Sequence, residues 1–79
     1  MYTMLKWKRK ATQMSIKKIE KIQSDIDSLY EHLDKFDLLE MMEDVGFYHG
    51  ISEFLSATDK SLDLLRRSVK DIDKQLEEM

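Results

Sequence analysis

The stretch from Ile19 to Phe36, IEKIQSDIDSLYEHLDKF, carries apolar residues at alternating intervals of three and four positions. This spacing is typical of the a and d positions of a heptad, which form one apolar stripe along an α-helix. The members of the stripe are Ile19, Ile22, Ile26, Leu29, Leu33 and Phe36. We therefore predict a helix near 15–36, with Ser15 as a candidate N-cap residue.

The last third of the chain carries a second stripe with the same spacing. Its apolar members are Leu55, Leu62, Leu65, Val69, Ile72, Leu76 and Met79. Thr58 occupies one position of the pattern and is its polar exception. Because no glycine follows position 50, the pattern predicts a helix near 51–78, with an ion pair between Asp63 and Arg67 on its surface. We expect the chain to self-associate through the two stripes.

The register of the first stripe breaks after Phe36, because its continuation would place Glu40 and Glu43 in the core. The run from Asp37 to Glu40 matches a capping box, in which an N-cap carboxylate and a glutamate three residues later satisfy free backbone amides. It predicts a new short helix near 38–45.

Gly46 and Gly50 bracket the segment that follows this short helix. Glycine costs about 1 kcal/mol inside a helix and is favoured just past a helix end, so the pair predicts a turn over 46–50. The alternative is a single helix over 38–56 that runs through both glycines.

Length and composition limit how the chain can be stabilised. It has 79 residues and no cysteine, which excludes disulfides and thiolate metal sites. A chain this short has a marginal core, so helix packing and oligomerisation remain as sources of stability. We predict an all-α fold, either an antiparallel helical hairpin or a small three-helix bundle with coiled-coil-like seams, completed by dimerisation. The helical domain covers 15–79, and a basic arm or helix extension covers 1–14.

Charge is distributed unevenly along the chain. Residues 1–21 hold seven basic residues and one acidic residue, a net charge of +6, whereas residues 22–79 carry a net charge of −9. Such asymmetry indicates a basic tail that meets an anionic surface, or the acidic part of another copy.

The basic arm interleaves cations with an aromatic residue, a composition suited to nucleic acid. The candidate contacts are Lys6, Trp7, Lys8, Arg9 and Lys10. Contact with an anionic membrane surface is a weaker alternative. In a third alternative the arm binds no ligand and packs against the rest of the protein.

The middle of the chain concentrates methionine and aromatic residues, which adaptable interfaces favour. The candidate partner-binding residues are Met41, Met42, Phe47, Tyr48 and Phe54. The alternative is that they complete the core.

Nothing in the sequence predicts catalysis or a cofactor. A nucleophile would have to be a serine or threonine assisted by His32 or His49, and no nucleophile elbow, Glu-x-x-His metal motif or phosphate-binding loop occurs. The acids near the glycines are expected to form a solvated face, with His49 in contact with Glu53. No stretch is apolar enough for a membrane span or signal peptide, so we expect a cytoplasmic protein.

The tripeptide Tyr48-His49-Gly50 resembles the Trp-x-Gly turn of the small helical-hairpin proteins secreted by type VII systems. That resemblance implies a secreted helical hairpin. The length and the acidic hairpin with a basic arm also resemble small regulators and inhibitors from bacteria and their phages.

These observations predict a non-catalytic helical module that forms a homodimer and binds a protein partner as an adaptor, inhibitor or regulator. A small nucleic-acid-binding regulator that uses the basic arm is the alternative. No cofactor or metal is expected.

Overall fold

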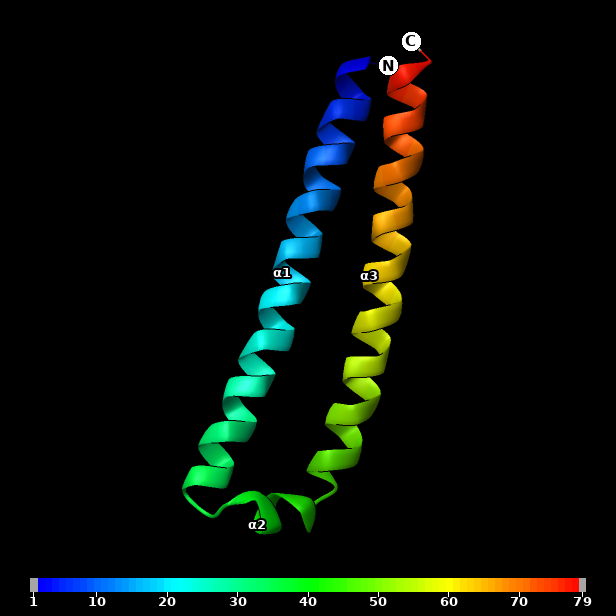
Figure 1. Cartoon of the computed structure of the whole chain (residues 1–79). Coiled ribbons are helices and arrows are strands. Elements are labelled where there is room, and N and C mark those ends of the chain that lie inside the picture. Colours follow the sequence, from blue (N-terminus) through cyan, green and yellow to red (C-terminus); the bar gives the residue numbers. More distant parts are fainter. Residues whose placement is uncertain (1, 79) are drawn as a thin grey trace.

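A computed structural model describes residues 2–78, and each of the three elements in that range is an α-helix (Figure 1). Helix α1 spans Tyr2–Lys35, α2 spans Leu39–Glu43 and α3 spans Phe47–Glu77. The predicted all-α class is therefore confirmed. Met79, the last member of the predicted C-terminal stripe, lies outside the described residues.

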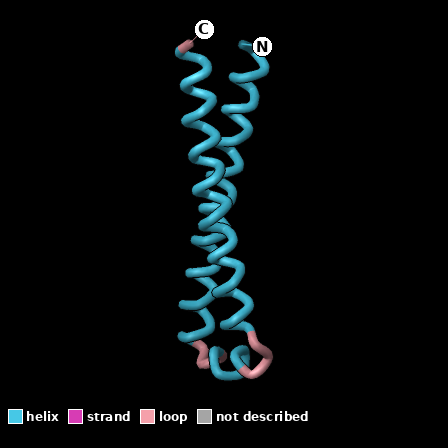
Figure 2. Tube along the Cα trace, turned by 90° about the vertical axis from the view of Figure 1, so that its right-hand side faces the viewer, coloured by secondary structure: helices cyan, strands magenta, loops and turns pink. Residues whose placement is uncertain are grey.

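The two long helices lie side by side and run in opposite directions, with α2 crossing between them at the closed end (Figures 1 and 2). The molecule measures 56 × 18 × 14 Å. Its accessible surface is 6477 Å², whereas a compact monomer of 9.4 kDa exposes about 5,000 Å². The chain is therefore extended and leaves an unusual amount of its surface in solvent.

The helices meet along one heptad stripe on each. The inward stripe of α3 consists of Ile51, Leu55, Thr58, Leu62, Leu65, Val69, Ile72 and Leu76, all of them buried or half-buried. The inward stripe of α1 consists of Leu5, Arg9, Thr12, Ile16, Ile19, Gln23, Ile26, Tyr30 and Leu33. The core is thin, since its most buried apolar residues are Ile26, Leu33, Leu62 and Ile72.

The predicted stripe of α1 divides into two rows in the structure. Ile26 and Leu33 face α3, but Ile22, Leu29 and Phe36 are 42%, 40% and 56% exposed. The cause is geometric, because α1 carries three adjacent rows of heptad spacing and one partner helix covers only two of them. The rows that α3 covers include Gln23, whereas the neighbouring Ile22 belongs to the exposed row.

Helix α1 begins at Tyr2 rather than near Ser15, so the N-cap prediction is wrong. Ser15 lies in the helix interior, where its hydroxyl donates a hydrogen bond of 2.9 Å to the carbonyl oxygen of Ala11. No glycine or proline precedes it, and the upstream segment is rich in good helix formers. Residues 2–14 therefore continue the helix.

Asp37 ends α1 and does not cap α2, so the predicted capping box is also wrong. Its φ of 59° is left-handed. The amide of Leu38 donates to the carbonyl of Leu33 at 2.8 Å, and the amide of Asp37 donates to the carbonyl of Asp34 at 3.2 Å. This pair of bonds is a Schellman motif, which satisfies the last carbonyls of a helix. Leu38 is the N-cap residue of α2 and has no side-chain capping bond within the described chain.

The break before α3 covers 44–46, and Gly46, at its end, has a left-handed φ of 75°. Gly50 lies inside α3, and its amide donates to the carbonyl of Gly46 at 3.1 Å. The predicted turn over 46–50 is therefore wrong in its bounds, because the turn covers 44–46 and residues 47–50 are helical. The alternative single helix over 38–56 is wrong, because the chain leaves the helical conformation at Gly46.

The two glycines are expected to respond to alanine in opposite ways. Gly46→Ala forces a side chain into a left-handed conformation and should destabilise the chain by about 1 kcal/mol. Gly50→Ala adds a Cβ that meets nothing within 4 Å and should stabilise α3 by about 0.5–1 kcal/mol. Thermal unfolding followed by circular dichroism checks both, and a Gly46→Ala variant as stable as the Gly50→Ala variant would contradict the left-handed turn.

Candidate interaction surfaces

A polar layer crosses the inward stripes near the middle of the hairpin. The side-chain amide of Gln23 donates to the hydroxyl of Thr58 at 2.9 Å and to the carboxylate of Asp59 at 2.8 Å. Thr58 is 8% exposed and donates to the carbonyl of Leu55 at 2.8 Å. Such a satisfied polar layer fixes the register of two helices, because a shifted register would leave its groups unpaired.

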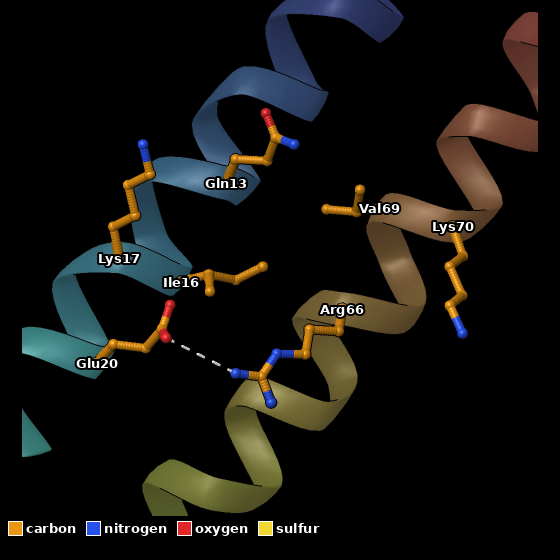
Figure 3. A pocket seen from close by; sticks show the side chains of 7 residues that line it. All are labelled: Gln13, Ile16, Lys17, Glu20, Arg66, Val69 and Lys70. Atoms are coloured by element: carbon orange, nitrogen blue, oxygen red, sulfur yellow. Dashed lines mark ion pairs between the residues drawn. The ribbon is translucent and has the colours of Figure 1, made fainter.

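Charged contacts join the helices along one side of the hairpin. Arg9 forms an ion pair with Asp73, and Glu20 lies 3.9 Å from Arg66. Figure 3 shows the second pair at the edge of a groove of 490 Å³ whose apolar floor includes Ile16 and Val69. All four charged side chains are more than a third exposed, so each pair adds only about 0–1 kcal/mol.

The opposite side of the hairpin carries exposed apolar residues. Ile22 and Leu29 of α1, and Phe36 directly after it, lie on the flank away from Glu20. On α3 Phe54, which is 45% exposed, lies on the flank away from Arg66. Since Glu20 and Arg66 approach each other across one side, this row and Phe54 share the other. We call these four residues the apolar side: Ile22, Leu29, Phe36 and Phe54.

An aromatic cluster joins the long helices at the closed end. The ring of Tyr30 lies 5.8 Å from that of Phe47 and 5.9 Å from that of Tyr48, the latter edge-on. Partial burial raises the pKa of the Tyr30 phenol above its ordinary value, and the neighbouring Tyr48 and Glu43 raise this pKa further. The cluster packs the first turn of α3 against α1.

The predicted partner-binding residues divide between half-buried and exposed positions. Phe47 and Met42 are half-buried, whereas Met41 is 60% and Tyr48 is 59% exposed. With Phe54, the structure therefore presents three of the five predicted residues to solvent around the closed end.

The predicted nucleic-acid residues lie in the first three turns of α1. Arg9 turns inward to Asp73, while the other four are exposed. The ammonium group of Lys10 lies 5.9 Å from the ring of Trp7, which is 67% exposed. The remaining member of the set near an aromatic ring is Lys6, whose ammonium group lies 4.5 Å from Tyr2.

The fold separates charge between the two ends of the molecule. Because α3 returns antiparallel to α1, the electroneutral segment 60–78 comes back toward the basic segment 2–21. The segment between them, 22–59, holds ten acidic residues and one lysine, a net charge of −9. The open end is therefore basic and the closed end strongly acidic.

The predicted surface pairs of α3 are both present. His49 lies 3.1 Å from Glu53, and Arg67 lies 3.0 Å from Asp63. Within residues 2–78, no three histidine, aspartate or glutamate side chains are grouped so that they could hold a metal ion. None of the helices described is long and apolar enough to cross a membrane.

The sequence did not single out the residues of α1 that contact α3 at the middle and at the closed end of the hairpin. They are Gln23 and Tyr30, which lie seven residues apart in the row that begins with Arg9 and Ile16. The available signal was their heptad spacing relative to Ile26 and Leu33. This signal was weaker than that of the neighbouring row, whose members Ile22, Leu29 and Phe36 are all large and apolar.

The tripeptide Tyr48-His49-Gly50 lies in the first two turns of α3 rather than in the connection between helices. Comparison of the chain with protein-family models, with curated proteins and with solved structures finds no match.

Proposed function

We propose that this chain is a non-catalytic helical interaction module that self-associates as a dimer and binds a protein partner. The observation that carries the proposal is the excess of exposed apolar side chains over buried ones. Among residues 2–78, twelve large apolar residues are 40% or more exposed, whereas four apolar residues are buried. Four of these residues, Ile22, Leu29, Phe36 and Phe54, share the apolar side, and grouped exposed apolar residues are typical of a protein–protein interaction site.

The closed end is the surface we assign to the partner. Met41, Tyr48 and Phe54 are exposed there around the aromatic cluster, and aromatic side chains dominate the energetics of interfaces. The surrounding charge is acidic, which favours a partner with a basic surface through long-range attraction.

The partner site is tested with two tyrosine variants of similar exposure. Tyr48→Ala should weaken capture of the partner about tenfold, the loss expected for an interface anchor of about 1.4 kcal/mol. Tyr2→Ala, at the other end of the molecule, should leave capture unchanged. The measurement is affinity capture from extracts of the native host, followed by mass spectrometry and titration of the captured protein. Equal affinity for both variants would remove the closed end as the partner site.

A nucleic-acid-binding regulator is the second candidate, supported by the exposed Lys6, Trp7, Lys8 and Lys10 on one helical segment. It predicts retardation of DNA or RNA in a low-salt gel, with affinity falling steeply as salt rises. Replacing the three lysines by glutamine should abolish the retardation and leave α1 folded, because Arg9 keeps its ion pair with Asp73. A wild-type chain that retards neither nucleic acid at low salt would exclude this function.

A further inference from the structure

Helix α1 has a second face that α3 does not cover. It contains the exposed row of Ile22, Leu29 and Phe36, and in the first half of the helix it continues through Ala11 and Met4, which is 75% exposed. These positions lie on the side of α1 away from Glu20. The face carries large apolar side chains at Met4 and from Ile22 to Phe36, with Lys8, Ala11, Ser15 and Lys18 between them. It follows the whole length of α1, so it is long enough for another long helix.

Charges on this face change sign along the helix. Lys8 and Lys18 lie in its first half, and Asp25 lies in its second half. The whole helix follows the same pattern, because 2–21 carries a net charge of +6 and 22–35 a net charge of −3. A partner that complements the face must therefore be acidic beside the first half of α1 and basic beside the second.

A second copy of α1 in the opposite direction has that pattern. If position 20 of one helix lies opposite position 20 of the other, Met4 faces Phe36 and Ala11 faces Leu29. Lys18 then lies near Asp25 of the other copy. A parallel arrangement would instead place each lysine opposite itself and each aspartate opposite itself, and like charges directly opposed are unfavourable.

We propose that two copies of this chain pack face to face with their α1 helices antiparallel, through Met4, Ala11, Ile22, Leu29 and Phe36. This inference rests on the proposed self-association and specifies its surface and direction. An antiparallel pair is isologous, so both copies use the same patch and the assembly closes as a dimer. It also brings the acidic closed end of each copy over the basic open end of the other.

The surface area agrees with this arrangement. Each chain exposes 6477 Å², roughly 1,500 Å² more than a compact protein of its mass. A standard interface buries about 800 Å² on each partner. Covering one face of α1 therefore falls within the excess surface.

Single cysteines test the direction of packing, because the natural chain has none. Ser15 and Asp25 both lie on the proposed face and are opposite each other in the antiparallel dimer. A mixture of the Ser15→Cys and Asp25→Cys chains should form the mixed disulfide on mild oxidation, with little of either symmetric product. Ser24→Cys, on the other side of α1, is the control and should form no disulfide with Ser15→Cys.

The outcomes distinguish failure of this inference from failure of the proposed self-association. Symmetric disulfides of Ser15→Cys in excess over the mixed product would show a parallel dimer and overturn the inference. A dimer mass under reducing conditions, without the mixed disulfide on oxidation, would overturn the inference alone. A monomer mass at all concentrations would overturn both the inference and the proposed self-association.

Discussion

Replacing Leu62 with alanine is expected to remove a large share of the free energy of unfolding of the chain. Leu62 is 4% exposed and lies in the inward stripe of α3, near the middle of the hairpin. Truncating a buried leucine costs about 2–5 kcal/mol, the sum of lost burial and the cavity left behind. A domain of this length has only about 4–12 kcal/mol of stability in total. With so few buried residues, the hairpin has no second core to compensate.

The matched control is Leu64→Ala, two residues along the same helix. Leu64 is 67% exposed, so the same truncation should change the free energy of unfolding by no more than about 0.5 kcal/mol. Urea unfolding followed by circular dichroism measures both. Equal destabilisation by the two variants would show that α3 does not bury the face assigned to it.

Introducing a charge at Leu29 is expected to prevent self-association while leaving the hairpin folded. Leu29→Glu places a carboxylate in the middle of the proposed α1 face, where a dimer would have to bury it among apolar side chains. Burying an unpaired charge costs several kcal/mol, so the dissociation constant should rise by roughly a hundredfold or more. Because Leu29 is 40% exposed in the single chain, the same glutamate stays hydrated within the hairpin.

Ser24→Glu is the control for this change. It adds the same charge to an exposed position of α1 on the side away from the proposed face. Light scattering on both variants at matched concentrations should give a monomer for Leu29→Glu and the wild-type mass for Ser24→Glu. A Leu29→Glu chain that keeps the wild-type mass and helicity would show that this face takes no part in association.

The inward stripe of α3 was predictable from the sequence, whereas that of α1 was only partly so. In α3 the apolar residues occupy two adjacent rows, and the one polar member, Thr58, is satisfied by Gln23 and by a backbone carbonyl. In α1 the apolar residues occupy three rows. Hydrophobicity alone favoured the row of Ile22, but packing against α3 selected the row of Gln23 and Tyr30, whose partners lie on α3.

The connection between the long helices shows a different limit of sequence reasoning. An aspartate followed three residues later by a glutamate is compatible both with the start of one helix and with the end of another. Asp37 adopts the left-handed conformation because the carbonyls at the end of α1 take up the amides of Asp37 and Leu38. The identity of Gly46 as the break, rather than Gly50, depends on where the returning helix must begin to reach Tyr30 with Phe47.

The composition of the candidate surfaces could be predicted from the sequence, but the place of their residues in the fold could not. The basic arm and the methionine-rich middle are visible in the sequence, yet the inward turn of Arg9 toward Asp73 requires the antiparallel fold. The same fold brings the neutral end of α3 alongside the basic arm. The concentration of negative charge at the closed end follows from this arrangement.

Sedimentation equilibrium of the wild-type chain across micromolar concentrations tests the proposed self-association most directly. The expected result is a mass that approaches twice the 9.4 kDa of the single chain as concentration rises. A stable, fully helical species at the mass of one chain throughout that range would contradict it.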